Sequence, residues 1–300
     1  MQILRFCLTS IIDVVKFINS YFKTFVFLFI VLWIFLSNSD SSGSLNSLAN
    51  LERIDLKGEI TDVSKVLEKI IDAKNNVNIK GVLFVIDSPG GAFAPSMELA
   101  LAIKDLRKEK PVVVYASGTM ASGSYLSGVG ANLILANPAS FIGSIGVIMQ
   151  GADLSELAKK LGVKEQSIKA GAFKEAGTFT RAWSEEERRY LQNLINQSYE
   201  LFTNFVAQER NLKLEDKEKW ANARVFLSFE AKELGLIDEL SNYENAKKQL
   251  ENLAKVKNPI WKKEEVNVWD KILNRLSEQG VKMFSSILTQ FYSTQKFQVL

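Results

Sequence analysis

The sequence predicts an α/β fold, in which a parallel sheet is flanked by helices, preceded by one N-terminal transmembrane helix. Strand-like and helix-like stretches alternate between residues 51 and 136 with short connections, which is typical of βαβ units with right-handed crossovers. The stretch 79–87 is an almost unbroken apolar run, as expected for a parallel strand covered on both faces. Another apolar run, near the N-terminus, is long enough to cross a bilayer.

The predicted transmembrane anchor covers residues 17–37. Its central part, from Phe22 to Leu36, reads FKTFVFLFIVLWIFL and carries a single charge, on Lys23. A helix of about 20 apolar residues spans a bilayer core of roughly 30 Å. A helix buried in a soluble core is the alternative, although so long an apolar run rich in Phe is unusual there.

The charges around the anchor predict its orientation. Arg5 and Lys16 precede the apolar run, whereas residues 37–42 contain no positive charge. The positive-inside rule therefore assigns residues 1–16 to a cytoplasmic tail, and the rest of the chain to the periplasmic or extracytoplasmic side of the inner (cytoplasmic) membrane. A cleaved signal peptide is the competing interpretation, but no Ala-x-Ala-like site follows the run.

The remaining chain divides into a linker, one domain and a tail. Residues 38–50 are rich in Ser and Asn and predict a flexible linker, and residues 51–257 form the predicted domain. Residues 258–300 carry apolar side chains at roughly helical spacing. They predict a C-terminal helical tail that packs on its own core, on a neighbouring subunit or at a membrane surface.

The first half of the domain supplies the predicted sheet, and the second half is mostly helical. Thr61-Asp62 is suited to cap a helix, and Ser184 to Glu187 has the pattern of a capping box. Gly235 is suited to end a helix, because glycine adopts positive φ without strain. The predicted strands are 51–60, 79–87, 112–115 and 132–136, and the predicted helices are 62–71, 96–106, 125–129 and 184–209, with 231–240 closing the domain.

Composition restricts the chemistry. The chain has no histidine, so it holds neither a Ser-His-Asp triad nor a histidine-ligated zinc ion. Its single cysteine, Cys7, forms no intrachain disulfide. The small net charge of +3, with Lys and Glu interspersed, argues against a nucleic-acid partner. A hydrolase built from this chain needs a carboxylate or a lysine as its base, and no metal or organic cofactor is implied.

Two turns at the carboxyl ends of successive predicted strands mark the candidate site, because sites in open α/β sheets form at this edge. The turns are 88–91, which reads SPGG, and 116–122, which reads ASGTMAS and leads into a helix. A serine there lies beside the first free N–H groups of the helix and is a candidate nucleophile. A lysine activates it only if burial or positive charge lowers the lysine pKa from about 10.4. Lys174, flanked by Gly, Ala and Phe, is the candidate base, and a solvated surface lysine is the alternative.

Four motifs follow one another along the domain: DSPGG at 87–91, MASGSY at 120–125, ANPASFIGSIGV at 136–147 and AGAFKEAGTFTR at 170–181. Together they resemble the signal peptide peptidase A (SppA) family of membrane-anchored bacterial serine proteases, in its single-domain form. The resemblance covers about residues 51–245. It implies a fold like that of Clp protease and crotonase, a Ser–Lys dyad, and hydrolysis of cleaved signal peptides.

The resemblance implies a role for individual residues. Ser122 is the implied nucleophile, Lys174 the general base, and Ser144 the group that orients the lysine amine. Each has a structural alternative: Ser122 as a small packing residue and Ser144 as a turn residue. Ser117 and Ser124 are the rival nucleophiles.

The implied oxyanion site consists of the backbone N–H groups of Gly91 and Gly123, with Gly90 allowing a substrate carbonyl to approach the backbone closely. A plain type II turn after Pro89 is the alternative for the two glycines at 90 and 91. The family usually has Gly where Ser124 stands, and often Asp at the position after the catalytic lysine, where this chain has Glu175.

The predicted function is that of a membrane-anchored serine endopeptidase acting on signal peptides or other apolar peptides. The resemblance also implies a homo-oligomeric ring in which Ser and Lys meet across a subunit boundary. One alternative is a quality-control protease for membrane proteins that uses the same site. A non-catalytic ring scaffold of the same fold and an acyl-CoA-binding relative of crotonase are others, the last disfavoured by the predicted extracytoplasmic location.

Overall fold

The structure, a computed structural model, describes residues 16, 20–32 and 48–263. Residues 49–262 form one compact unit, and residues 20–32 form a helix outside it, with exposed apolar side chains such as Phe27 and Phe29. In the described part of the chain, no helix combines the length and the apolar character needed to cross a membrane. Much of the predicted anchor and tails lies outside the described residues, namely 1–15, 17–19, 33–47 and 264–300.

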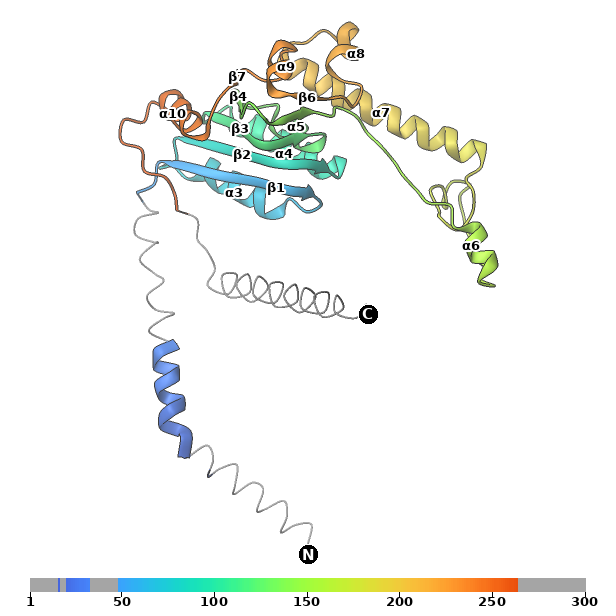
Figure 1. The fold of residues 1–300 in the computed structure, drawn as a ribbon, viewed down its shortest axis with the longest axis horizontal. Coiled ribbons are helices and arrows are strands. Elements are labelled where there is room, and N and C mark those ends of the chain that lie inside the picture. The colour runs from blue at the N-terminus through green and yellow to red at the C-terminus, as the bar shows by residue number, and fades with distance from the viewer. Residues whose placement is uncertain (1–15, 17–19, 33–47, 264–300) are drawn as a thin grey trace, which may run out of the picture. The chain divides into compact units, whose positions relative to one another are not determined.

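A mostly parallel sheet forms the centre of the unit, in the order β1-β2-β3-β4-β7, and helices flank it (Figure 1). The α/β fold with a parallel sheet is therefore confirmed. Two short strands lie off this path: β5 pairs in parallel with the end of β3, and β6 pairs antiparallel with β5. The strands are β1 (Leu51–Ile60), β2 (Gly81–Gly91), β3 (Val112–Ala121), β4 (Leu133–Ala136), β5 (Phe141–Gly143), β6 (Val225–Leu227) and β7 (Glu239–Leu240).

The helices follow the predicted pattern in the first half of the domain. The long helix α7 begins at the predicted capping box: the Ser184 hydroxyl accepts from the Glu187 N–H, and the Glu187 carboxylate accepts from the Ser184 N–H. Gly235 has a φ of 78° just after helix α9, as predicted. The helices are α3 (Ser64–Asn75), α4 (Phe93–Leu106), α5 (Gly123–Gly128), α6 (Ser155–Lys160), α7 (Glu185–Arg210), η1 (Leu214–Asp216), α8 (Lys217–Trp220), α9 (Ser228–Glu233) and α10 (Tyr243–Leu253).

Apolar side chains cover both faces of the sheet, as the unbroken apolar runs predict. On β2, Phe84 and Ile86 belong to a large core cluster with side chains of α3, α4, α5 and α7. The alternate residues Leu83 and Val85 belong to a smaller cluster on the other face, with Leu250 of α10. This alternation follows from the period of two in a strand. The sheet is thereby fixed from both sides, and its carboxyl edge is a rigid base for a site.

One sequence prediction about the sheet edge was wrong. The segment 116–118 is not the end of a strand, because β3 continues to Ala121 and pairs with β5 there. The irregularity lies inside the strand: the Asp87 carboxylate accepts a 2.9 Å hydrogen bond from the Thr119 N–H. A Cβ on Gly118 would lie 2.3 Å from the same carboxylate oxygen, so a larger residue would displace the Asp87 side chain from this hydrogen bond. Asp87 therefore stabilises a bulge, and the strand-to-helix turn lies at residue 122.

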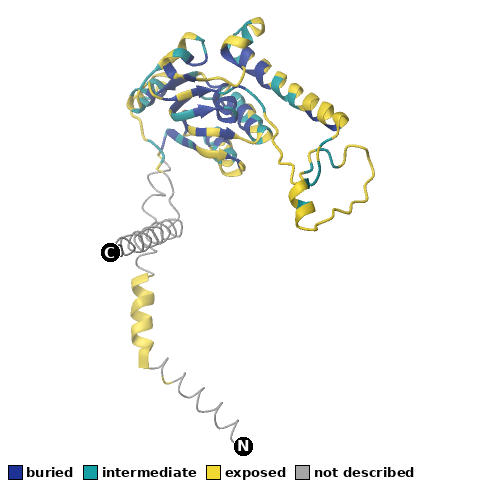
Figure 2. Cartoon of the chain, turned by 45° about the vertical axis from the view of Figure 1, so that its right-hand side comes forward, coloured by how far each residue is buried: buried dark blue, intermediate teal, exposed yellow. Residues whose placement is uncertain are grey.

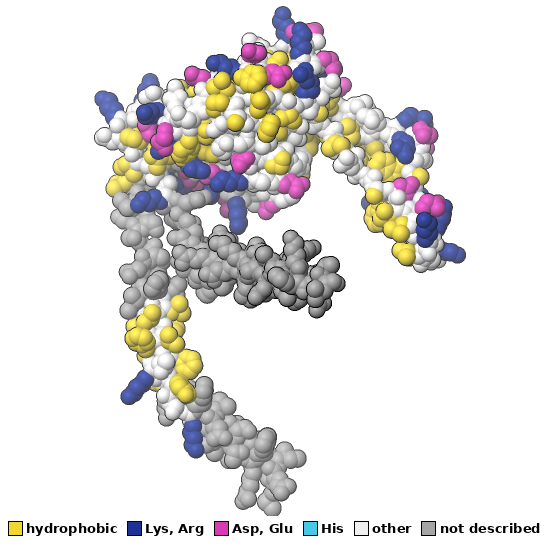
Figure 3. All heavy atoms as spheres, viewed as in Figure 1, with side chains coloured by type: hydrophobic (Ala, Val, Ile, Leu, Met, Phe, Trp, Pro, Cys, Tyr) yellow, Lys and Arg dark blue, Asp and Glu magenta, His cyan; other side chains and the backbone are white. Residues whose placement is uncertain are grey.

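Residues 144–184 form an arm that leaves the sheet after β5 and reaches the N-terminal end of α7 (Figure 1). Figure 2 shows that this arm, unlike the body, is almost entirely exposed or half-buried. Apolar side chains lie on its surface (Figure 3), and Ile148, Leu161 and Ile168 are among the exposed ones. An apolar surface of this kind on a projecting segment is typical of an interaction site.

Candidate active site

Ser122 lies at the junction between β3 and α5, in an unusual backbone conformation. Its φ is 54° and its ψ is −126°, a region in which residues other than glycine are strained. The Ser122 N–H donates a 2.7 Å hydrogen bond to the Gly143 carbonyl at the end of β5, which holds the strained turn in place. Its side chain is half-buried at the carboxyl edge of the sheet. A strained serine on a strand-to-helix turn is the arrangement that exposes a nucleophile in many hydrolases.

The end of β2 lies directly against this turn. A Cβ added to Gly90, whose φ is 98°, would lie 2.7 Å from the Gly123 nitrogen and 2.8 Å from the Ser122 Cβ. A Cβ on Gly91 would lie 2.2 Å from the Ile60 carbonyl oxygen. Neither position has room for a side chain, so the two glycines do more than form a turn. Gly90 lets the end of β2 reach the candidate nucleophile, and Gly91 lets it lie close to Ile60 of β1.

Gly123, the first residue of α5, is equally constrained. Its hypothetical Cβ would lie 2.2 Å from the Ser96 hydroxyl oxygen of α4 and 3.3 Å from the Gly91 nitrogen. The Gly91 and Gly123 backbones therefore lie close together beside Ser122. The structure brings together four of the predicted site residues here: Ser122, Gly123, Gly90 and Gly91.

The rival serines have other partners. The Ser124 hydroxyl is fully buried, donates to the Ser88 carbonyl at 2.6 Å and accepts from the Ala121 N–H at 2.8 Å. It joins the ends of β2 and β3 and faces away from the site surface. The Ser117 hydroxyl, in the second half of β3, donates to the Ile86 carbonyl at 3.3 Å. Ser122 is thus the serine whose hydroxyl remains at the sheet edge.

Ser144 occupies the equivalent position after β5. Ala121 pairs with Gly143 in the parallel ladder between β3 and β5, so Ser122 and Ser144 each follow directly on paired strand ends. Ser144 is half-buried, has a φ of 49°, and donates its N–H to the Arg224 carbonyl at 2.7 Å. The sequence gives little indication of this pairing, because β5 is only three residues long.

Lys174 is not brought to Ser122 within this chain. Lys174 belongs to residues 161–184, the segment that joins α6 to the start of α7, and this segment lies at the end of the arm away from the sheet (Figure 1). Its side chain is exposed, in a segment that contributes nothing to the core. In a single chain, the candidate nucleophile therefore lies at the sheet edge and the candidate base lies on the arm.

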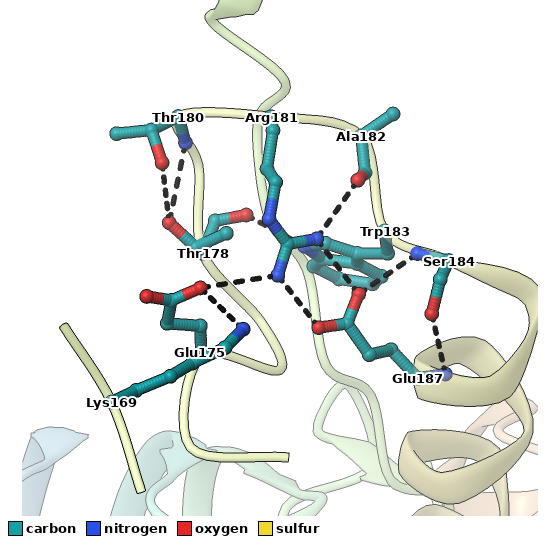
Figure 4. A network of polar contacts seen from close by, with 9 residues as sticks. All are labelled: Lys169, Glu175, Thr178, Thr180, Arg181, Ala182, Trp183, Ser184 and Glu187. Atoms are coloured by element: carbon teal, nitrogen blue, oxygen red, sulfur yellow. Dashed lines mark hydrogen bonds and ion pairs between the residues drawn. The ribbon is translucent and has the colours of Figure 1, made fainter. Parts of the chain in front are cut away.

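An ionic network that the sequence did not predict holds the loop that contains Lys174 (Figure 4). The Glu175 carboxylate binds the Lys169 amine at 2.7 Å and the Arg181 guanidinium at 3.5 Å. Arg181 also donates two hydrogen bonds, of 2.9 and 2.7 Å, to the buried carboxylate of Glu187. The Lys169 amine lowers the pKa of Glu175 to about 2, and the Arg181 guanidinium lowers the pKa of Glu187 to about 2. The only sequence signal for this network was the capping-box role of Glu187.

Several known proteins are similar to this chain in sequence. A protein of Methanocaldococcus jannaschii that is named as a protease is 40% identical over 198 residues, which make up 66% of this chain and 64% of that protein. A protein of Synechocystis sp., also named as a protease, is 36% identical over 68% of this chain and 74% of its own length. A protein of Enterococcus faecium named as a signal peptide peptidase SppA is 32% identical over 71% of this chain and 59% of its own length. The chain thus matches less than two thirds of the first and third of these relatives.

Among solved structures, a mutant of the 1510-N membrane-bound stomatin-specific protease has a TM-score of 0.46 and 19% identity, covering 68% of this chain and 85% of that one. The model of peptidase family S49 matches residues 104–257, which is just over half of the chain and includes Ser122, Ser144 and Lys174. The chain belongs to peptidase family S49.

Proposed function

We propose that this protein is a serine endopeptidase in which Ser122 is the nucleophile and Lys174 the general base. The observation that carries the proposal is the arrangement at the sheet edge: a strained serine on the β3–α5 turn, with two glycine backbones packed against it. Membership of peptidase family S49 supports the same reaction.

The proposed reaction is acyl transfer. The Ser122 hydroxyl oxygen attacks the carbonyl carbon of the scissile peptide bond, and its proton passes to the neutral amine of Lys174. The N–H groups of Gly91 and Gly123 stabilise the negative oxygen of the tetrahedral intermediate. When the C–N bond breaks, the lysine returns the proton to the leaving amine, and an ester remains on Ser122. Water, deprotonated in turn by Lys174, hydrolyses the ester and regenerates both groups.

The catalytic site is completed by a second copy of the chain. Lys174 lies far from Ser122 in one chain and is exposed, whereas a lysine base requires an apolar, buried environment. Apolar side chains are exposed along the same arm (Figure 3). An assembly in which the arm packs on a neighbouring body covers these side chains and delivers Lys174 to the neighbour's Ser122 and Ser144. Such contacts repeated head to tail close a homo-oligomeric ring.

The proposed substrates are extended apolar peptides, such as released signal peptides. Residues 148–152, shortly after Ser144, belong to no helix or strand. Within the described part of the chain, their N–H and C=O groups form no hydrogen bond with another backbone group. Met149, Gly151 and Trp183 line a hollow beside them. An unpaired backbone beside a shallow hollow, which Gln150 lines together with apolar side chains, is suited to bind a peptide as an added strand. The apolar run at 17–37 anchors the enzyme with its body outside the cytoplasm, close to such substrates.

The test uses the full chain in detergent and a quenched apolar peptide, with wild type, Ser122→Ala, Lys174→Ala and an equimolar, co-refolded mixture of the two variants. We expect both variants to lose at least about 1000-fold in kcat, because the two groups act as a unit. The mixture regains activity if each site takes Ser122 and Lys174 from different chains. Full activity of Lys174→Ala would show that the base is another group.

A serine-directed phosphonate separates the enzyme from a non-catalytic scaffold of the same fold. We expect it to label Ser122 in wild type and to leave Ser122→Ala unlabelled. Assembly without labelling and without hydrolysis of any peptide would support the scaffold. Labelling of Ser117 or Ser124 in place of Ser122 would contradict the assignment of the nucleophile.

A further inference from the structure

Both neighbours of Lys174 in the chain are attached to the first turns of α7. The ring of Phe173 stacks on the ring of Tyr190, with centroids 4.6 Å apart and an interplanar angle of 23°. On the other side, the Glu175 carboxylate contacts the Arg181 guanidinium. Lys174 therefore lies between two residues that contact the same helix: Phe173 directly, and Glu175 through Arg181.

Arg181 connects the loop to the helix (Figure 4). One of its terminal nitrogens contacts Glu175, and both terminal nitrogens bind the Glu187 carboxylate. Glu187 also accepts from the Ser184 N–H at 2.8 Å, so its position is fixed by the start of the helix. The Glu187 side chain is only 7% exposed, and a guanidinium matches a carboxylate with two parallel hydrogen bonds, which a lysine amine cannot do.

The helix itself is anchored in the body. Phe202 and Val206, in its C-terminal half, belong to the large core cluster. Arg210 at its end binds Asp238 at 2.8 Å. With 26 residues, α7 is about 39 Å long. Because its C-terminal half is packed in the core, the helix also fixes the position of its N-terminal end, which contacts the loop.

We propose that Arg181 is a positioning residue for Lys174, acting through Glu175 and Glu187, and that it sets where the lysine amine arrives in the neighbouring active site. This inference rests on the proposed Ser–Lys function. The loop has no buried apolar residue of its own, so contacts of this kind hold it in place. Besides the ion pairs and the Phe173–Tyr190 stack, the Trp183 indole N–H donates to the Thr178 carbonyl, and the Leu154 N–H donates to the Phe179 carbonyl. Of these contacts, only the ion pairs and the stack involve the two neighbours of Lys174. A displacement of about 1 Å at a reacting group costs roughly 100-fold in rate, so a small loosening of the loop is sufficient to lower kcat.

The first experiment compares Arg181→Gln, Arg181→Lys and Arg189→Gln in the full chain. Arg189 is the matched control, because it lies in the same part of α7 as Glu187 and its side chain is exposed. Among the described residues, Arg189 forms no ion pair, whereas Arg181 binds Glu187. We expect Arg181→Gln to lower kcat about 10- to 100-fold with KM changed less than about twofold. Arg181→Lys should recover part of the loss, and Arg189→Gln should resemble wild type. Hydrogen exchange of residues 170–178 should accelerate in Arg181→Gln only.

A second experiment places the same substitution on either partner of a mixed assembly. In the mixture of Ser122→Ala and Lys174→Ala chains, only the Ser122→Ala chain supplies the lysine. We expect Arg181→Gln to lower activity when it is on the Ser122→Ala chain, and to have little effect on the Lys174→Ala chain. A purely structural role of Arg181 would lower activity equally from either chain, and that result would overturn the proposal.

The outcomes also separate this proposal from the proposed function. If Lys174→Ala is inactive while Arg181→Gln keeps the wild-type kcat, only the positioning role is wrong. If Lys174→Ala is fully active, the Ser–Lys function is wrong, whatever hydrogen exchange shows. If the mixture shows no activity, the kcat of the single Arg181 variants decides, and an unchanged kcat or unchanged exchange of 170–178 overturns the positioning role.

Discussion

Ser122 and Ser144 follow directly on two strand ends that pair with each other, and both have positive backbone φ angles, of 54° and 49°. The hydrogen bond from the Ser122 N–H to the Gly143 carbonyl joins the two turns. Two such angles at neighbouring strand ends support the proposal that this sheet edge is the active site.

The strain at Ser122 leads to a prediction about stability. Ser122→Gly removes the Cβ that makes this backbone unfavourable, whereas Ser122→Ala keeps it. We expect Ser122→Gly to be more stable than Ser122→Ala by about 1 kcal/mol in denaturant unfolding, although both are inactive. Equal stability of the two variants would show that the turn is unstrained.

We expect Gly123 to accept a side chain only if the side chain of Ser96 is also removed. Gly123→Ala places a Cβ 2.2 Å from the Ser96 hydroxyl oxygen, so α4 and α5 must separate. We expect a loss of about 1–3 kcal/mol in the free energy of unfolding. The double variant Ser96→Gly with Gly123→Ala should regain part of this loss, and a double-mutant cycle measures it. Purely additive effects would contradict the contact.

Ser144 is predicted to orient the lysine amine that reaches the site. Ser144→Ala removes the hydroxyl, and we expect kcat to fall roughly 10-fold or more while KM changes little. Ser140→Ala, at a buried serine whose hydroxyl donates to the Ala116 carbonyl, is the control for a general loss of stability. A kcat of Ser144→Ala equal to that of wild type would limit Ser144 to a turn residue.

The loop that contains Lys174 should loosen in acid. The pKa values of Glu175 and Glu187 are lowered from 4.5 to about 2 by Lys169 and Arg181, the charged groups that face them. A lowered pKa in the folded state gives a stabilisation that is complete above pH 4.5 and is lost as the pH falls from 4.5 towards 2.

Fluorescence of Trp183 reports on this transition, because its indole N–H donates to the Thr178 carbonyl in the same loop. We expect its signal, taken as the difference from Trp183→Phe, to change in that pH range. In Glu187→Gln, which has no carboxylate to titrate there, the change should be smaller. A transition above pH 5 would point to other groups.

The sequence by itself determined the alternating strands and helices of the first half of the domain and the long helix α7, but not the short strands β5 and β6 or the helices α6, α8 and α10. Apolar periodicity, the capping box at Ser184 and the glycine at 235 are local signals, and they placed β1, α7 and the end of α9 correctly. The absence of histidine restricts the base to a carboxylate or a lysine, whatever the fold. The four glycine- and serine-rich motifs indicated which residues matter at the sheet edge.

Only the tertiary structure decided which residues meet. The register between β3 and β5 places Ser122 beside Ser144, and no local signal encodes a ladder of three residue pairs. The packing of Gly90, Gly91 and Gly123 depends on segments from β1, β2, β3, α4 and α5. The ion pairs between Glu175, Arg181 and Glu187 depend on how the loop folds back onto α7. Lys174 is separated from Ser122 because residues 144–184 leave the sheet as an arm. The number of residues between the two side chains does not determine their distance in space. Long-range contacts of this kind are set by the assembled core, which the sequence specifies only as a whole.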